Sequence, residues 1–288
     1  RQRREEGAEK CRMAQQINVG ALEEAVAKEE DEGVAGEMRA LLRKQRCGAI
    51  EVEYTRATRG EGRWYATRKE QLQSCRRRTR QVALAGIGWE VDLCASFPSL
   101  LVGIAADLGR EGGRRVRCEA LEGYARKTED ARKRMAGEYN TKKENVKKGV
   151  NGVLFGGSIA AWKERNGVSM VARSEGMERI QKEVKRARVL VAEREKKRSP
   201  GARGMKDCAL LSRAVGREEE WVMQRVQARV EREGWRVGTM IHDAIIVTRH
   251  KGGDDKAKLV ATVQAALEEA TAERGWATGL IRAKVTAT

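Results

Sequence analysis

The feature that most constrains this chain is an acidic residue set between two short apolar segments. Residues 235–247 read Trp-Arg-Val-Gly-Thr-Met-Ile-His-Asp-Ala-Ile-Ile-Val, so a His-Asp pair interrupts a run rich in Val, Ile and Thr. These residue types favour strands, and the polar pair falls where a tight turn would join them. A buried Asp243 is costly unless it is paired or binds a metal. The pattern predicts a β-hairpin in which Asp243 is either a polar turn residue or a metal ligand.

The charge of the chain indicates a polyanionic partner. Its 288 residues include 59 Lys and Arg against 42 Asp and Glu, and the formal net charge of +17 is spread along the sequence. Nucleic acid is the first candidate and a membrane surface is the second. No stretch approaches the roughly 18 uninterrupted apolar residues of a membrane span, and no signal-peptide pattern is present. We therefore expect no membrane partner. We also expect a monomer.

Cysteine and histidine usage argues against a structural zinc site. The chain has two histidines, and its six cysteines lie far apart with no Cys-x-x-Cys pair. A reducing, intracellular compartment fits this spacing better than a disulfide framework. Two prolines, few aromatic residues and abundant Ala, Glu, Arg and Lys favour a mainly helical protein with a small sheet. The predicted fold class is α+β.

A second acidic residue lies in another apolar, strand-like segment. Asp92 belongs to the run Trp-Glu-Val-Asp-Leu, and Phe97-Pro98 interrupts the chain before a helix predicted to begin near Ser99. Taken alone, Asp92 is a candidate turn or helix-capping residue. Taken with Asp243, it is a candidate for the second member of a carboxylate pair.

A basic helix is predicted downstream of Asp92. Lys143, Lys147, Asn151 and Phe155 are spaced four apart and share one helical face. This face, with two cations, an amide and an aromatic ring in a row, is suited to binding a triphosphate and a base. The alternative is an ordinary amphipathic helix. Gly149 and Gly152 each weaken a helix by roughly 1 kcal/mol relative to Ala. We interpret glycines placed at such a cost as a sign that a ligand or neighbouring backbone approaches the helix closely.

An arginine cluster follows the Trp64-Tyr65 pair. Four arginines within five positions are suited to gripping phosphates, and the alternative is a solvated helix face. The cluster consists of Arg76, Arg77, Arg78 and Arg80.

In this order, the blocks resemble the palm and fingers of family-A nucleic-acid polymerases, the group of bacterial DNA polymerase I and the phage-type single-subunit RNA polymerases. The strand with Asp92 resembles the first catalytic motif of the family. Ile241-His242-Asp243 resembles the third, which is usually Val-His-Asp-Glu. The resemblance covers roughly residues 55–250.

Two further segments carry the resemblance. The segment that contains Lys143 and Lys147 is similar to the family's nucleotide-binding helix, Arg-x3-Lys-x3-Phe-x3-Tyr-Gly, with Asn151, Phe155 and Gly156 at its later positions. Gly62-Arg63, Leu72-Gln73 and Arg76 resemble the Gly-Arg…Leu-Gln…Arg stretch that precedes the first motif.

The chain departs from the family pattern on the nucleotide-binding helix. Lys143 replaces an Arg, Asn151 replaces an aromatic residue, and Phe155 replaces a Tyr. In an alternative register, Lys148 and Asn151 match the family's Lys-x-x-Asn, and the aromatic position moves to Gly156.

The two catalytic motifs also depart from the pattern. Ala244 replaces the acid that usually follows the catalytic Asp. The run from Asp92 to Phe97-Pro98-Ser99 is similar to the Asp-x4-Tyr-Pro-Ser of family B, but the chain lacks the Tyr-x-Asp-Thr-Asp of that family.

The resemblance implies a small antiparallel palm sheet with packed helices, a mainly helical fingers insertion and a helical N-terminal arm. The implied segments are an N-terminal arm with a reduced thumb role (residues 1–50), the first part of the palm (51–110), the helical fingers (111–199) and the second part of the palm (200–288).

The implied activity is template-directed nucleotidyl transfer by DNA polymerase chemistry with two Mg²⁺ ions, or Mn²⁺ in their place. The metal ligands would be Asp92, Asp243 and the Leu93 carbonyl, with Glu90 as a weaker substitute. The nucleotide would contact Lys143, Lys147, Asn151, Phe155 and Phe97, where Phe97 either closes on the sugar 2′ position or packs in the core. The nucleic acid would contact Arg63, Arg76, Arg77, Arg78, Arg80 and His242.

The implied partners are a DNA primer-template, or RNA in its place, and nucleoside triphosphates. Two other classes of function remain open. One is a catalytically inactive basic nucleic-acid-binding protein, and the other is an RNA polymerase or reverse transcriptase on the same scaffold. The geometric discriminator is whether Asp92 and Asp243 lie on neighbouring strands with their carboxylates within a few ångströms of each other.

Overall fold

The chain forms two compact units. The computed structural model describes residues 10–56, 64–68, 70–112, 116–241, 244–248 and 256–288. Unit 1 comprises Arg1–Leu93, Glu220–Ala270 and Ala283–Thr288, and unit 2 comprises Cys94–Glu219 and Thr271–Arg282. The four segments predicted from the sequence have other boundaries and stay predictions.

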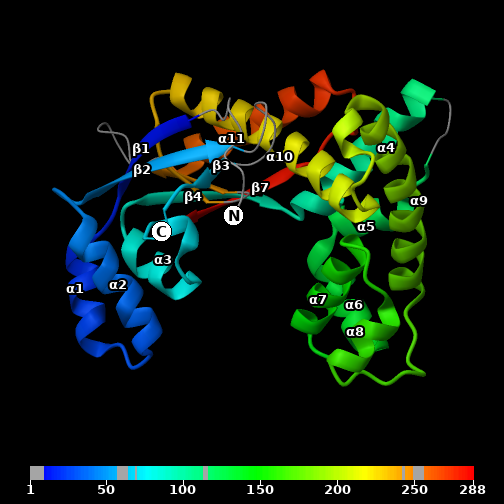
Figure 1. Ribbon diagram of the computed structural model, residues 1–288, viewed down its shortest axis with the longest axis horizontal. Coiled ribbons are helices and arrows are strands. Elements are labelled where there is room, and N and C mark those ends of the chain that lie inside the picture. Colours follow the sequence, from blue (N-terminus) through cyan, green and yellow to red (C-terminus); the bar gives the residue numbers. More distant parts are fainter. Residues whose placement is uncertain (1–9, 57–63, 69, 113–115, 242–243, 249–255) are drawn as a thin grey trace. The chain divides into compact units, whose positions relative to one another are not determined.

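A four-stranded sheet contains Asp92 and the two segments on either side of the His-Asp pair. It consists of β5 (Arg236–Ile241), β6 (Ala244–Thr248), β4 (Gly88–Cys94) and β7 (Arg282–Ala287), in the order β5-β6-β4-β7. Strand β6 pairs antiparallel with both β5 and β4. The predicted strands on either side of the His-Asp pair are therefore confirmed, and the α+β fold class with them (Figure 1).

The two faces of this sheet differ because side chains alternate along each strand. Val91, Leu93, Ile245 and Val247 occupy one face and are all buried. Ile246 occupies the opposite face, where it joins a core cluster that contains Tyr54 and Leu72. Asp92 shares that second face with Ile246.

A three-stranded sheet packs into the same cluster. It consists of β1 (Lys10–Gln16), β2 (Ala49–Arg56) and β3 (Trp64–Ala66), in the order β1-β2-β3, with antiparallel pairing throughout. The prediction that residues 1–48 are helical is wrong for residues 10–16. All seven residues of β1 pair with β2, and buried Gln15 accepts a hydrogen bond from the Leu72 amide at 3.2 Å. Long-range pairing outweighs the weak strand propensity of this segment.

Helices α1 (Val19–Lys28) and α2 (Glu32–Lys44) follow β1. The side chains of Asn18 and Asp31 cap their N-termini by accepting backbone amide hydrogen bonds. Leu22 and Met38 are fully buried in the core cluster. The expectation of a solvated arm is therefore wrong, since both helices contribute to the core. The short helices η1 (Leu72–Ser74) and α3 (Arg77–Leu84) complete this part of unit 1.

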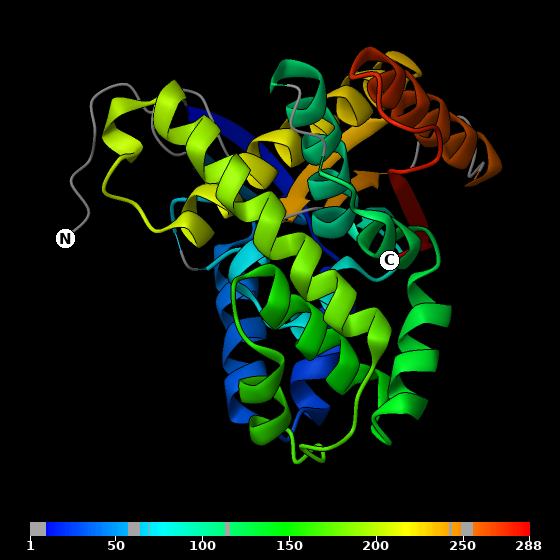
Figure 2. The same ribbon diagram turned by 90° about the vertical axis from the view of Figure 1, so that its right-hand side faces the viewer.

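Most of unit 2 consists of helices that lie between β4 and β5 in the chain. It contains α4 (Ser96–Gly112), α5 (Glu119–Arg126), α6 (Thr128–Glu138), α7 (Lys143–Leu154), α8 (Ile159–Arg165) and α9 (Glu175–Arg198). The 24-residue helix α9 packs against α4, α5, α7 and α8 (Figure 2). The short helix η2 (Pro200–Ala202) follows it.

Two long helices complete the chain. Helix α10 (Asp207–Arg232) begins in unit 2 and ends in unit 1, and α11 (Lys256–Glu273) begins in unit 1. Their apolar stripes, including Val226 and Val263, are buried as the helical spacing predicts. None of the helices in the described ranges is long and apolar enough to span a membrane.

Candidate active site

The register of the four-stranded sheet places the two acidic motifs on adjacent strands. Asp92 of β4 lies directly opposite Ala244 of β6, the residue that follows Asp243. Ile241 of β5 pairs with Ala244 as well, so residues 242–243 join β5 to β6. His242 and Asp243 themselves lie outside the described residues.

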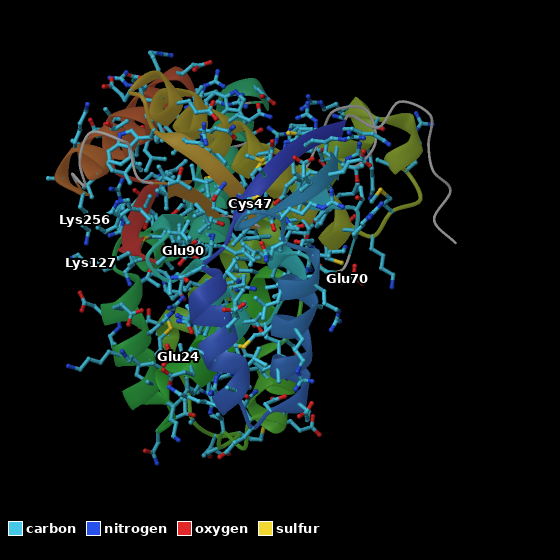
Figure 3. The ribbon with its side chains drawn as sticks, turned by 90° about the vertical axis from the view of Figure 1, so that its left-hand side faces the viewer. Glu24, Cys47, Glu70, Glu90, Lys127 and Lys256 are labelled. Atoms are coloured by element: carbon cyan, nitrogen blue, oxygen red, sulfur yellow. The ribbon has the colours of Figure 1, made fainter. Side chains whose placement is uncertain are left out.

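The face of β4 that bears Asp92 is its polar face. Glu90 and Asp92 are both half-buried, whereas Trp89, Val91 and Leu93 on the other face are buried (Figure 3 labels Glu90). The Leu93 side chain is 3% exposed. Carboxylate oxygens are the ligands that Mg²⁺ prefers, so Asp92 and Glu90 have suitable donor chemistry. In the described ranges, no group of three or more His, Cys, Asp and Glu side chains could hold a metal.

The four candidate nucleotide-binding residues of α7 form an exposed stripe in unit 2. Lys143, Lys147, Asn151 and Phe155 are all exposed, whereas Val146 and the other apolar residues of the helix are buried. Lys143 donates a hydrogen bond to Glu129 at 3.2 Å and lowers the pKa of that carboxyl group. At 1.5 Å per residue, the stripe from Lys147 to Phe155 is about 12 Å long.

The glycines of α7 have a different explanation from the predicted one. A Cβ atom at Gly149 would lie 2.7 Å from the Trp162 indole, so this glycine accommodates an aromatic side chain of α8 rather than a ligand or backbone. The Trp162 indole N–H donates to the Asn145 carbonyl at 2.8 Å, which fixes the ring against α7. A Cβ at Gly152 would meet nothing within 4 Å.

Phe97 and Phe155 contact each other. Their ring centroids are 4.9 Å apart with an interplanar angle of 62°, an edge-to-face arrangement. They are the only two phenylalanines of the chain. Phe155 is 54% exposed at the C-terminal end of α7, and Phe97 is half-buried in the first turn of α4. The structure thus joins two candidate nucleotide-binding residues that are 58 positions apart in sequence (155 − 97 = 58).

Arg188 lies at the same end of α7, and the sequence did not single it out. A Cβ at Gly156 would lie 2.5 Å from the Arg188 guanidinium, so this α9 side chain lies against the residue next to Phe155. The only signal in the sequence was the basic character of α9. The contact depends on the packing of α9 against α7, which sequence spacing does not reveal.

The predicted phosphate-binding arginines of unit 1 divide into paired and unpaired members. Arg76 forms an ion pair with Asp31 at 2.9 Å, and Arg78 forms one with Glu29 at 2.8 Å. Arg80 donates to a backbone carbonyl. Arg77 is exposed and has no such partner among the described residues. Arg63 lies outside the described ranges.

The fold built by these elements is similar to that of a solved DNA polymerase domain. The chain is similar to the solved POL domain of Pol1 from M. smegmatis, in complex with DNA primer-template and dNTP, with a TM-score of 0.57 at 12% sequence identity. The match covers 88% of this chain and 50% of that one, so this chain spans half the length of the matched structure. No protein-family model and no curated protein sequence matches the chain.

Proposed function

We propose that the chain carries out template-directed nucleotidyl transfer, as a DNA polymerase of the family-A kind. One observation carries the proposal: in a polymerase-like fold, Asp92 pairs with the neighbour of Asp243 on the adjacent strand. Two carboxylates on adjacent strands are the minimal protein platform for the divalent ions that this reaction uses.

In this proposal, unit 1 supplies the metal ligands. Asp92 and Asp243 would bind two Mg²⁺ ions, or Mn²⁺, and Glu90 lies two residues from Asp92 on the same polar face. The ions would activate the primer 3′ hydroxyl and neutralise the leaving group. The protein would hold both carboxylates in place through the antiparallel pairing of β4, β6 and β5. His242 would contact the primer terminus.

Unit 2 would supply the groups that bind the incoming nucleotide. Lys147, with Lys143, would neutralise the triphosphate as charge develops in the transition state. The Phe97–Phe155 pair would offer an aromatic surface to the base and sugar, and Arg188 adds a cation at the same end of α7. Asn151 lies between the lysines and the rings on the same face.

The test is a comparison of Asp92→Asn with the unchanged protein in primer extension and in primer-template binding. We expect extension to fall by about a hundredfold or more, because developing charge would lose its stabilisation. Binding should change little, since phosphate contacts dominate affinity. Glu90→Gln is the matched control on the same strand face and should retain more activity. Extension by Asp92→Asn at the unchanged rate would contradict the metal-binding role.

One observation favours a second function, a basic nucleic-acid-binding protein without catalysis. Ala244 lies opposite Asp92 and is 4% exposed, so the position where the family has an acid carries a buried methyl group. Binding of primer-template without Mg²⁺- or Mn²⁺-dependent extension would support this function. Extension assays on DNA and RNA templates with each nucleotide set would separate a DNA polymerase from an RNA polymerase or reverse transcriptase.

A further inference from the structure

A tight, unusual turn connects β4 to α4. Ala95 has a φ of 48°, in the left-handed region that residues other than Gly and Asn rarely adopt. Its carbonyl accepts the first helical hydrogen bond of α4, from the Ser99 amide at 3.0 Å. Phe97 lies in the first turn of this helix, two residues after Ala95. Because the conformation is intrinsically unfavourable for Ala, the surrounding structure must hold it.

A buried hydrogen bond next to this turn provides such a restraint. The Ser96 hydroxyl donates to the Glu219 carboxylate of α10 at 2.8 Å. Ser96 is 7% exposed and Glu219 is 1% exposed. A hydrogen bond to a buried carboxylate is stronger than one between neutral groups. A carboxylate close to the first residue of a helix also interacts favourably with the helix dipole.

The neighbours of Glu219 on α10 are themselves fixed within unit 2. Arg217 forms two hydrogen bonds with Glu195 of α9, at 2.7 and 3.0 Å. Glu218 accepts a hydrogen bond from Arg274 at 2.6 Å. Three consecutive residues of α10 thus make buried or partly buried polar contacts with separate parts of the unit. These contacts hold the segment of α10 that presents Glu219 to Ser96.

We propose that Glu219 is a positioning residue for the nucleotide-binding face. Through Ser96 it holds the turn at Ala95, and this turn directs Phe97 into edge-to-face contact with Phe155. Its effect on nucleotide binding rests on the function proposed above, whereas its effect on the two rings does not. The contact that carries this effect is the hydrogen bond from Ser96 to Glu219.

The composition of the chain allows a direct test. Because Phe97 and Phe155 are its only phenylalanines, replacing Phe with 4-fluorophenylalanine labels just this ring pair. Two ¹⁹F resonances are expected, with a through-space contact between them. Ser96→Ala and Glu219→Ala should shift the Phe97 resonance and weaken that contact, and Ser96→Thr, which keeps the hydroxyl, should preserve it.

Two variants of Glu219 distinguish the effect of side-chain length from the effect of charge. Glu219→Asp keeps the charge but shortens the side chain, so it should disturb the ring pair as Glu219→Ala does. Glu219→Gln keeps the length and an acceptor oxygen, so it should preserve the pair. Glu218→Gln is the matched control, one residue away and without a contact to Ser96. Circular dichroism and thermal unfolding of each variant verify that it is folded.

Kinetics provide the second readout. Loss of the Ser96 bond should raise the nucleotide KM by about tenfold, the size expected for one hydrogen bond to a charged group, with kcat little changed. Unchanged ¹⁹F spectra in folded Ser96→Ala and Glu219→Asp would overturn the positioning role. Altered spectra with an unchanged KM would show that Glu219 positions the rings but that the rings do not contribute to nucleotide binding. Absence of extension activity in the unaltered protein would refute the proposed function alone.

Discussion

In the described ranges, three residues other than glycine have a left-handed backbone conformation: Cys47, Ala95 and Asn140. Ala95 lies at the strand-to-helix junction beside the candidate site, and Cys47 lies in an exposed turn. In the turn, Arg46 and Ala49 exchange backbone hydrogen bonds, and the two central residues, Cys47 and Gly48, have φ values of 50° and 75°. Two positive φ values define a type I′ turn, for which Asn-Gly is the preferred pair.

We expect Cys47→Asn to stabilise the protein by about 1 kcal/mol, because Asn tolerates the left-handed region better than Cys does. The side chain is exposed, so no packing is lost (Figure 3 labels Cys47). The midpoint of urea unfolding measures the effect. Gly48→Ala is the opposite control and should destabilise, since it introduces a Cβ at φ 75°. An unchanged midpoint for both variants would contradict the turn assignment.

For single residues, the sequence predicted which side chains share a helical face but did not predict their tertiary partners. Helical spacing alone placed Lys147 and Phe155 together, because periodicity is a local property. The contact of Phe155 with Phe97, and that of Gly149 with Trp162, depend on helix packing that no local pattern encodes. The pairing of Arg76 with Asp31 joins residues 45 positions apart for the same reason.

Helices α9 and α10 are linked by a buried ion pair. Burial raises the pKa of Glu195, but the hydrogen bonds from Arg217 and the charges of Arg194 and Arg198 outweigh it, so the pKa is lowered overall. A carboxyl group with a lower pKa in the folded state contributes stability above its unfolded pKa, near 4.5. That contribution is lost as the pH falls through the lower, folded pKa.

We therefore expect the free energy of unfolding to decrease below about pH 4.5 in part through Glu195. Glu195→Gln should be less stable than the unaltered protein at pH 7, and the difference should narrow as the pH falls toward 3. Urea unfolding at a series of pH values measures both curves. A constant difference between them across this range would show that Glu195 has the same pKa in both states.

The secondary structure was predictable where its pattern is strong. The runs around Asp92 and Asp243 are rich in β-branched and aliphatic residues, and both are strands. The segment Lys10–Gln16 lacks such residues and forms a strand because β2 pairs with it along its full length. Helix α4 begins at Ser96, three residues before the predicted start, because Pro98 is tolerated in the first turn of a helix.

The net charge of +17 is a property of the whole chain, and it sets the salt dependence that we expect of the proposed binding to nucleic acid. Binding releases counterions, so log K should fall linearly with log salt, by about 0.9 per phosphate contacted on duplex DNA. Arg77→Ala should weaken binding and reduce the slope by about one. Arg76→Ala is the matched control and should change the slope less, because Asp31 already pairs with Arg76. Filter binding or fluorescence anisotropy from 50 to 300 mM salt would test this, and equal slopes for both variants would contradict it.

The order of strands in the four-stranded sheet also constrains how the protein can fold. Strand β4 is an inner strand, yet its partner β6 comes only after the first and larger segment of unit 2, Cys94–Glu219, has been synthesised. Contacts so distant in sequence form slowly, because a long loop must close before they are made. During synthesis, β4 therefore stays unpaired until residues 244–248 have been made. The helices of unit 2 that precede them can already pack through local contacts. The strand with Asp92 therefore exposes an apolar face that can aggregate until β6 has been made.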